Sequence, residues 1–136
     1  MQKVFLKWID GLRFAVSDEN KHSFIIDTKQ EIGGNETGFQ PVDLLLVSLA
    51  GCMGLDMVSI LKKKRSDLKN MEIVVEAERG PEHPKRYTHI TVKIKINKEV
   101  AEVDYQRAFE LSHDKYCSIL ATLKTPPDIK FEFVTE

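Results

Sequence analysis

Two cysteines are the residues of this sequence best suited to chemistry. Cys52 lies in the middle of a long apolar run, and Cys117 lies where a second helical pattern ends. If the fold brings them together, they can act as a thiol pair that reduces peroxides. If it does not, they are ordinary core residues, because free cysteine is among the most buried residue types. The two cysteines alone leave both interpretations open.

A polar stripe runs along the helix predicted around Cys52. Its members share an arc of roughly 80°, because a helix turns about 100° per residue: Ser48, Cys52, Asp56 and Ser59. The stripe either lines a site or packs at a close helix crossing, where Gly51 and Gly54 would let another backbone approach. An ionised Asp56 would raise the pKa of Cys52, so a reactive thiolate needs a basic residue from elsewhere. The candidates are Arg13, Arg79, Arg86, Lys115 and the histidines.

Other sequence motifs that carry chemistry are not indicated. The four histidines show no metal-ligand spacing, and neither cysteine belongs to a CxxC motif. His113 and Cys117 are four residues apart, but a lone pair of this kind is more often incidental. No dinucleotide-binding, phosphate-binding or serine-hydrolase motif is present. We therefore expect no bound cofactor and no metal.

Length and charge narrow the class of protein. A chain of 136 residues predicts a single domain over 1–136. The net charge of −1 gives no signal for nucleic acid or for an anionic membrane. The apolar stretch 42–61 is long enough to span a bilayer, but Asp56 would be costly in lipid, which favours a helix buried in a soluble core. The N-terminus lacks a signal-peptide pattern, so we expect a cytoplasmic protein, in which transient catalytic disulfides do occur.

The first half of the chain predicts strands followed by a long helix. Residues 2–28 predict a three-stranded antiparallel meander, with a turn at Asp10-Gly11. A glycine-rich loop over 29–40 follows. Pro41 then fits the first turn of a helix over 41–65, and Asp43 suits the positive end of its dipole.

The second half predicts a hairpin, helices and a last strand. Apolar and polar residues alternate over 71–79 and 88–97, which is typical of strands with one buried face. A helix is predicted over 100–116 and one or two further helical turns over 117–123. Ile129, Phe131 and Phe133 alternate in a predicted final strand.

Two separated segments, in the same order, resemble the OsmC/Ohr superfamily of thiol peroxidases. They are Pro41–Leu46 with Leu49–Cys52, and Ser112–Ser118. The similarity covers nearly the whole chain, and the branch most resembled has an aspartate shortly after the first cysteine, here Asp56. The resemblance implies an α+β fold built as an intertwined homodimer, in which antiparallel sheets wrap two long central helices.

The resemblance also implies a chemistry. Cys52 would attack an organic hydroperoxide and become a sulfenic acid, and Cys117 would condense with it to a disulfide. An external dithiol of the lipoyl type would reduce that disulfide. The expected partners are a second copy of the chain and an organic hydroperoxide or another small apolar molecule.

The chain departs from the peroxidase pattern at one position. Those members carry a glutamate ten residues before the first cysteine, where this chain has Val42. Asp43 is adjacent but rotated by about 100° on the helix. Those members also use an N-terminal arginine, and Arg13 is the only arginine in that region. We assign supporting roles to Asp56, Asp43 and Arg13. The alternative function is a non-catalytic or differently reactive dimer that binds a small apolar ligand in its interface pocket.

Overall fold

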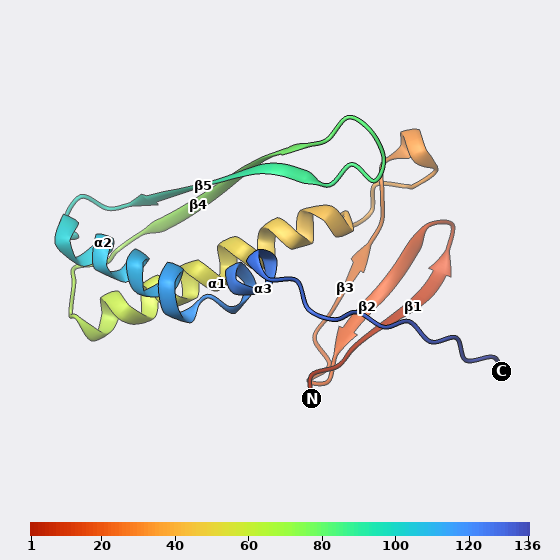
Figure 1. The fold of residues 1–136 in the computed structure, drawn as a ribbon, viewed down its shortest axis with the longest axis horizontal. Helices are drawn as coiled ribbons and strands as arrows, with labels where there is room; N and C mark the ends of the chain where they lie inside the picture. Colours follow the sequence, from red (N-terminus) through yellow and green to blue (C-terminus); the bar gives the residue numbers. More distant parts are fainter. The chain divides into compact units, whose positions relative to one another are not determined.

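The computed structural model describes residues 1–136, which divide into two units, Met1–Val47 and Ser48–Glu136. The first unit holds a three-stranded sheet, and the second holds a two-stranded sheet with helices (Figure 1). Helix α1 (Pro41–Lys63) begins in the first unit and continues through the second. Helices and antiparallel sheets together confirm the predicted α+β class. The single domain stays a prediction.

The N-terminal sheet is the predicted meander. Strands β1 (Val4–Asp10), β2 (Arg13–Asp18) and β3 (Ser23–Ile26) pair antiparallel in that order. Trp8 pairs with Phe14, and the register shifts just after Trp8. Gly11 has a φ of +46°, which a tight turn needs and glycine adopts at little cost. The indole Nε1–H of Trp8 donates to the carbonyl oxygen of Gly11 at 2.9 Å and fixes the turn.

A buried aspartate holds the glycine-rich loop. Asp27 is only 2% exposed, and its carboxylate accepts hydrogen bonds from the backbone N–H groups of Thr28, Asn35 and Thr37. The hydroxyl of Thr37 donates to it as well, at 2.6 Å. These donors, the Thr37 hydroxyl first, hold the pKa of Asp27 far below its usual range. The loop is therefore pinned around one charged group.

Two glycines let the same loop fold back on β3. A Cβ atom at Gly34 would collide with the carbonyl of Thr28, and one at Gly38 would collide with the carbonyl of Ile25. The loop carries one short 3-10 helix, η1 (Gln30–Ile32). It leads directly into α1 at Pro41, as predicted.

The second sheet is a hairpin of β4 (Met71–Arg79) and β5 (Tyr87–Ile96). Its register places Ile73 opposite Ile94, and burial alternates along both strands as the pattern predicts. One ion pair crosses the outer face of the hairpin, where Lys93 Nζ lies 2.8 Å from Glu76 Oε1. Both side chains are largely exposed, so this pair contributes at most about 1 kcal/mol.

A helical segment follows the hairpin and changes form before Cys117. Helix α2 (Glu102–Leu111) passes into a π-helical turn, η2 (Ser112–Tyr116), and then α3 (Ser118–Lys124) begins. The predicted helix over 100–116 is thus α-helical only to Leu111. Cys117 is the N-cap residue of α3.

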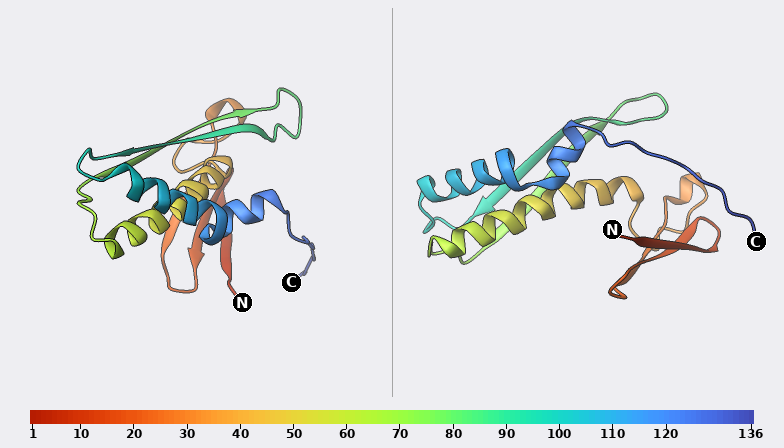
Figure 2. Two further views of the ribbon diagram at one scale, coloured as in Figure 1. Left: turned by 60° about the vertical axis from the view of Figure 1, so that its left-hand side comes forward. Right: turned by 60° about the horizontal axis from the view of Figure 1, so that its bottom comes forward.

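Helix α1 buries one face against the hairpin and the later helices of the second unit. Leu49, Met53, Met57 and Leu61 recur every four residues and are buried, beside side chains from the hairpin and from α2 and α3. Figure 2 shows the hairpin and the later helices running beside α1. The opposite face is uncovered: Val47 is 52% exposed and Leu55 is 76% exposed. By length and composition α1 is apolar enough to cross a membrane, and only 22% of its most apolar stretch is buried.

The predicted last strand is wrong for the single chain. No strand is assigned beyond β5, and the residues after Thr125 form no regular element. Ile129, Phe131 and Phe133 are 67%, 86% and 98% exposed. A strand forms only where a neighbour accepts and donates its backbone hydrogen bonds, and this segment has no such neighbour in the chain.

Asp27 predicts an acid-sensitive loop. Because the folded pKa is lowered, stability from this group is present above its unfolded pKa, about 3.9, and is lost as pH falls below it. We expect the unfolding free energy, from urea titrations at about pH 7 and about pH 3, to fall less on acidification in Asp27→Asn than in the wild type. Asp128→Asn, which changes an exposed carboxylate, is the control. Equal losses in Asp27→Asn and the wild type would contradict the assignment.

Candidate active site

The structure brings the two cysteines together. Cys52 lies in the middle of α1 and Cys117 at the start of α3, and both belong to one apolar cluster with Leu49 and Met53. Both thiols are free, and the thiol of Cys117 is among the groups that lower the pKa of Cys52. Two cysteines in direct contact can exchange between a dithiol and a disulfide.

Cys52 faces the first turn of α3. Its Sγ lies 3.9 Å from Oγ of Ser118, and the backbone N–H of Ile119 favours its thiolate. The N–H of Ile119 has the largest effect on the pKa of Cys52, and it lowers that pKa. The thiol of Cys117 and the hydroxyl of Ser118 lower it further, and these donors outweigh the opposite effect of partial burial. Donors from α3 therefore favour a thiolate at Cys52.

Cys117 has the opposite character. Its side chain is 4% exposed, and burial, with the nearby charge of Cys52, raises the pKa of its thiol. Its Sγ accepts the N–H of Leu120 at 3.4 Å, which caps α3. Cys52 is thus suited to act as a nucleophilic thiolate, whereas Cys117 is suited to stay protonated.

Asp56 does not bind Cys52. Its Oδ2 accepts the hydroxyl of Ser112 at 2.9 Å, and Ser112 is completely buried at the junction of α2 and η2. The carboxylate one turn beyond Cys52 is therefore already paired with another group.

The other expected supporting residues belong to the first unit. Asp43 lies in the first turn of α1, nine residues before Cys52, which is about 14 Å along the helix axis. Its side chain faces Nε2 of Gln40 at 3.5 Å. Arg13 forms a two-pronged ion pair with Asp10, with both nitrogen–oxygen distances 2.7 Å. Their roles at Cys52 stay predictions.

Sequence reasoning did not assign roles to Ser118, Ile119 or Ser112. A signal for the first two exists: Cys117-Ser118 precedes an apolar run, and small polar residues at that place predict a helix start. A helix start offers free N–H groups to a thiolate. Nothing in the spacing of Ser112 and Asp56 indicates that they meet.

Gly51 and Gly54 have different surroundings. A Cβ at Gly54 would lie 2.9 Å from Cδ1 of Ile73, so the hairpin does approach α1 closely there. A Cβ at Gly51 would meet nothing within 4 Å. The close helix crossing inferred from the sequence is therefore not found within this chain, because Gly54 meets a side chain of β4 and Gly51 meets open space.

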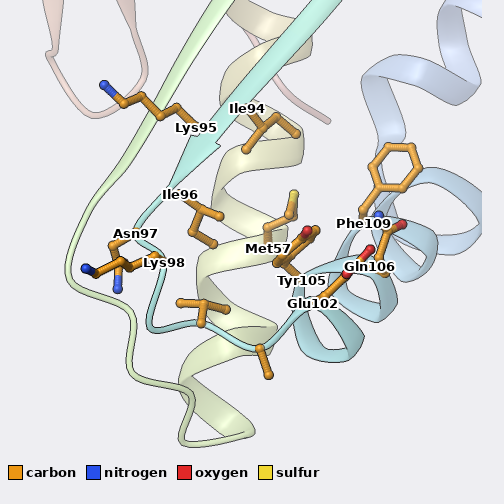
Figure 3. Close-up of a pocket in the computed structure, with 12 residues that line it drawn as sticks. Met57, Ile94, Lys95, Ile96, Asn97, Lys98, Glu102, Tyr105, Gln106 and Phe109 are labelled. Carbon is orange, nitrogen blue, oxygen red and sulfur yellow. The ribbon is translucent and has the colours of Figure 1, made fainter.

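A cavity of about 790 Å³ lies between α1, β5 and α2, away from the cysteines. Figure 3 shows Met57 directed toward Tyr105, with Ile94 and Ile96 of β5 facing them and Lys95 pointing away. Apolar side chains form its floor, and Lys98, Glu102 and other polar groups form its rim. No group of three or more His, Cys, Asp or Glu side chains in residues 1–136 is arranged to hold a metal.

Comparisons with known proteins find similar sequences and similar folds. Residues 33–132 match the family described as OsmC-like protein. The Escherichia coli protein YhfA is 30% identical over 94% of this chain and 93% of its own length. A hypothetical protein from Aquifex aeolicus has a crystal structure with a TM-score of 0.79 and 33% identity, covering 96% of this chain and 92% of its own. An organic hydroperoxide resistance protein from Legionella pneumophila has a TM-score of 0.67 at 12% identity, with 92% and 90% covered.

The opposite pKa shifts predict unequal reactivity of the two thiols. In reduced protein, alkylation of Cys52 by iodoacetamide should show a midpoint below that of the urea-unfolded protein, and alkylation of Cys117 a midpoint above it. Peptide mass spectrometry across a pH series separates the two rates. In urea-unfolded protein, both midpoints should return to the ordinary value. A folded protein in which both thiols share one midpoint would contradict the assignment.

Proposed function

We propose that this chain, which belongs to the OsmC-like protein family, is a thiol peroxidase that reduces organic hydroperoxides. The family match over residues 33–132 and the YhfA relative confirm the resemblance found in the sequence. The observation that carries the proposal is the packing of Cys52 and Cys117 in one cluster, where their pKa values shift in opposite directions. The Legionella protein, at 12% identity, supports the fold alone.

The proposed reaction has three balanced steps. The thiolate of Cys52 attacks the distal oxygen of the hydroperoxide, the O–O bond breaks, and with one proton the products are a sulfenic acid and an alcohol. The sulfur of Cys117 then attacks the sulfur of the sulfenic acid, and its proton leaves with the hydroxyl as water. An external dithiol reduces the resulting disulfide by exchange and is itself oxidised to a disulfide.

The thiolate in this proposal is stabilised by α3. Val42 stands where the peroxidase members have glutamate, so that carboxylate is missing. The N–H of Ile119 and the hydroxyl of Ser118 are the donors that face Cys52 instead. Hydrogen bonds to a charged sulfur favour the charged form in the same way as a nearby cation. Arg13 remains a proposed additional partner.

A homodimer is proposed because α1 and the C-terminal segment are left uncovered. Val47, Gly51 and Leu55 form an exposed stripe on the face of α1 opposite its buried residues. Gly51 leaves open space on that stripe, which would allow a second helix to approach closely. The alternating residues Ile129 and Phe133 offer an exposed segment that could pair with a sheet of a second copy. A soluble, cytoplasmic dimer that covers these surfaces is proposed, with neither nucleic acid nor membrane as a partner.

The alternative function places a small apolar ligand in the interface pocket of the dimer, and the cavity shown in Figure 3, which lies within one chain, offers a second place for such a ligand. It has an apolar floor and a volume within the range of small-molecule sites. A dimer that binds a small apolar ligand without reducing it would use this cavity and leave the thiols unchanged. Turnover of peroxide separates this function from the peroxidase.

Peroxide consumption tests the proposed reaction. With cumene hydroperoxide and dihydrolipoamide, we expect steady turnover in the wild type and a loss of more than about a hundredfold in Cys52→Ser, because the nucleophile is removed. Cys117→Ser should complete only the first step and retain a sulfenic acid, which dimedone traps. Full turnover in Cys52→Ser would overturn the proposal.

The oligomeric state tests the proposed dimer. Leu55→Glu would bury an unpaired charge against the second copy and should raise the dimer Kd at least about tenfold, measured by sedimentation equilibrium. Val103→Glu is a matched control, since Val103 on α2 is 75% exposed against 76% for Leu55. A monomeric wild type, or equal effects of the two variants, would contradict the assignment of this face.

A further inference from the structure

A buried serine and aspartate outside the reacting pair form an unusual link. Ser112 is completely buried, and its hydroxyl donates to Oδ2 of Asp56 at 2.9 Å. A buried hydroxyl is tolerated where it is hydrogen-bonded, and a carboxylate is a stronger acceptor than a neutral group. The bond joins α1 to the residue at which α2 turns into η2.

Ser112 also forms a backbone hydrogen bond with Cys117. The carbonyl oxygen of Ser112 accepts the N–H of Cys117 at 2.8 Å, which closes the π-helical turn. The thiol of Cys117 then accepts the N–H of Leu120 at 3.4 Å. A continuous path of hydrogen bonds therefore runs from the carboxylate of Asp56 through Ser112 to Cys117. π-Helical turns of this kind are frequent at functional sites.

Both ends of this path rest on one helix. Asp56 and Cys52 are four residues apart on α1, so they lie on the same face and about 6 Å apart along its axis. Asp56 holds the start of the η2–α3 turn, while Cys52 contacts its end at Cys117 and Ser118. A rigid helix thus fixes the separation between the anchor and the reacting sulfur.

We propose that Asp56 and Ser112 are positioning residues, whose hydrogen bond holds the η2–α3 turn against α1 and keeps Cys117 and the donors of α3 within reach of Cys52. The inference rests on the proposed function, because it assigns these residues to the same thiol pair. Positioning raises the effective concentration of one thiol at the other, which favours the disulfide over the dithiol. It also holds the N–H of Ile119 at the thiolate.

The groups around this pair could compete for its hydrogen bond. A cavity of about 400 Å³ borders Asp56 and is lined by Lys63, Lys64 and Tyr116 among others. These are the charged or titratable side chains that share the cavity with the carboxylate. In Ser112→Ala these side chains are available as other partners for Asp56. The hydrogen bond is therefore tested by substituting each of its two residues in turn.

The test measures the stability of the disulfide in four variants. Asp56→Ala and Ser112→Ala should each lower the equilibrium constant for disulfide formation about tenfold in a dithiothreitol redox buffer, which raises the reduction potential by about 30 mV. The double variant should lose little more than either single variant, because both remove the same bond. Asp56→Asn keeps an oxygen acceptor of the same shape and should recover most of the wild-type value.

A second serine–aspartate bond in the chain supplies the control. Ser66 donates to Oδ2 of Asp104 at 3.0 Å and links the end of α1 to α2 away from the cysteines. Ser66→Ala should reduce thermal stability without moving the potential. If Asp56→Ala and Ser112→Ala behave in the same way as Ser66→Ala, the pair is only structural and the inference is overturned.

The midpoint of Cys52 alkylation separates this inference from the proposed function. In Ser112→Ala, which leaves the charge of Asp56 in place, the midpoint should move up toward the ordinary thiol value, because the donors of α3 are no longer held at the thiolate. A wild type that forms no disulfide would overturn the peroxidase cycle, and the alkylation midpoint would still decide the positioning role. A midpoint identical in Ser112→Ala and in the wild type would overturn that role even if turnover is normal.

Discussion

The contact between the first turn of α3 and the middle of α1 is the interaction on which the candidate site depends. Cys52 is eleven residues past the start of its own helix, so the dipole of α1 gives its thiolate little help. The donors come instead from Ser118 and the N–H of Ile119. Packing of Leu120 and Ile119 against Leu49 and Met53 brings those donors to the sulfur. The chemistry of the thiol is therefore a product of tertiary packing.

The same contact gives the two thiols different properties. Cys52 is partly exposed and surrounded by donors, whereas Cys117 is buried and feels the charge of Cys52. Two identical side chains thus acquire pKa values that shift in opposite directions. A peroxidatic and a resolving cysteine need this asymmetry. It follows from the packing of the first turn of α3 against the side of α1.

Elements with a strong local pattern could be predicted from the sequence, and features made by distant contacts could not. Alternation at Ile73 and Ile94 predicted the hairpin, and Pro41 predicted the start of α1. The bond between Ser112 and Asp56 joins residues far apart in the chain, and no periodicity encodes it. The strand predicted around Phe131 failed for a related reason: its pattern describes a side chain preference, while a strand also needs a backbone partner.

The most direct test of the peroxidase account is the product formed by one equivalent of organic hydroperoxide. Fully reduced protein should be mixed with cumene hydroperoxide without oxygen or reductant, and its intact mass and tryptic peptides measured. The account predicts a loss of two hydrogen atoms per chain, one equivalent of alcohol, and a cross-linked peptide joining Cys52 to Cys117 within one chain. Unchanged thiols with intact hydroperoxide, or oxidation confined to residues other than Cys52, would contradict it.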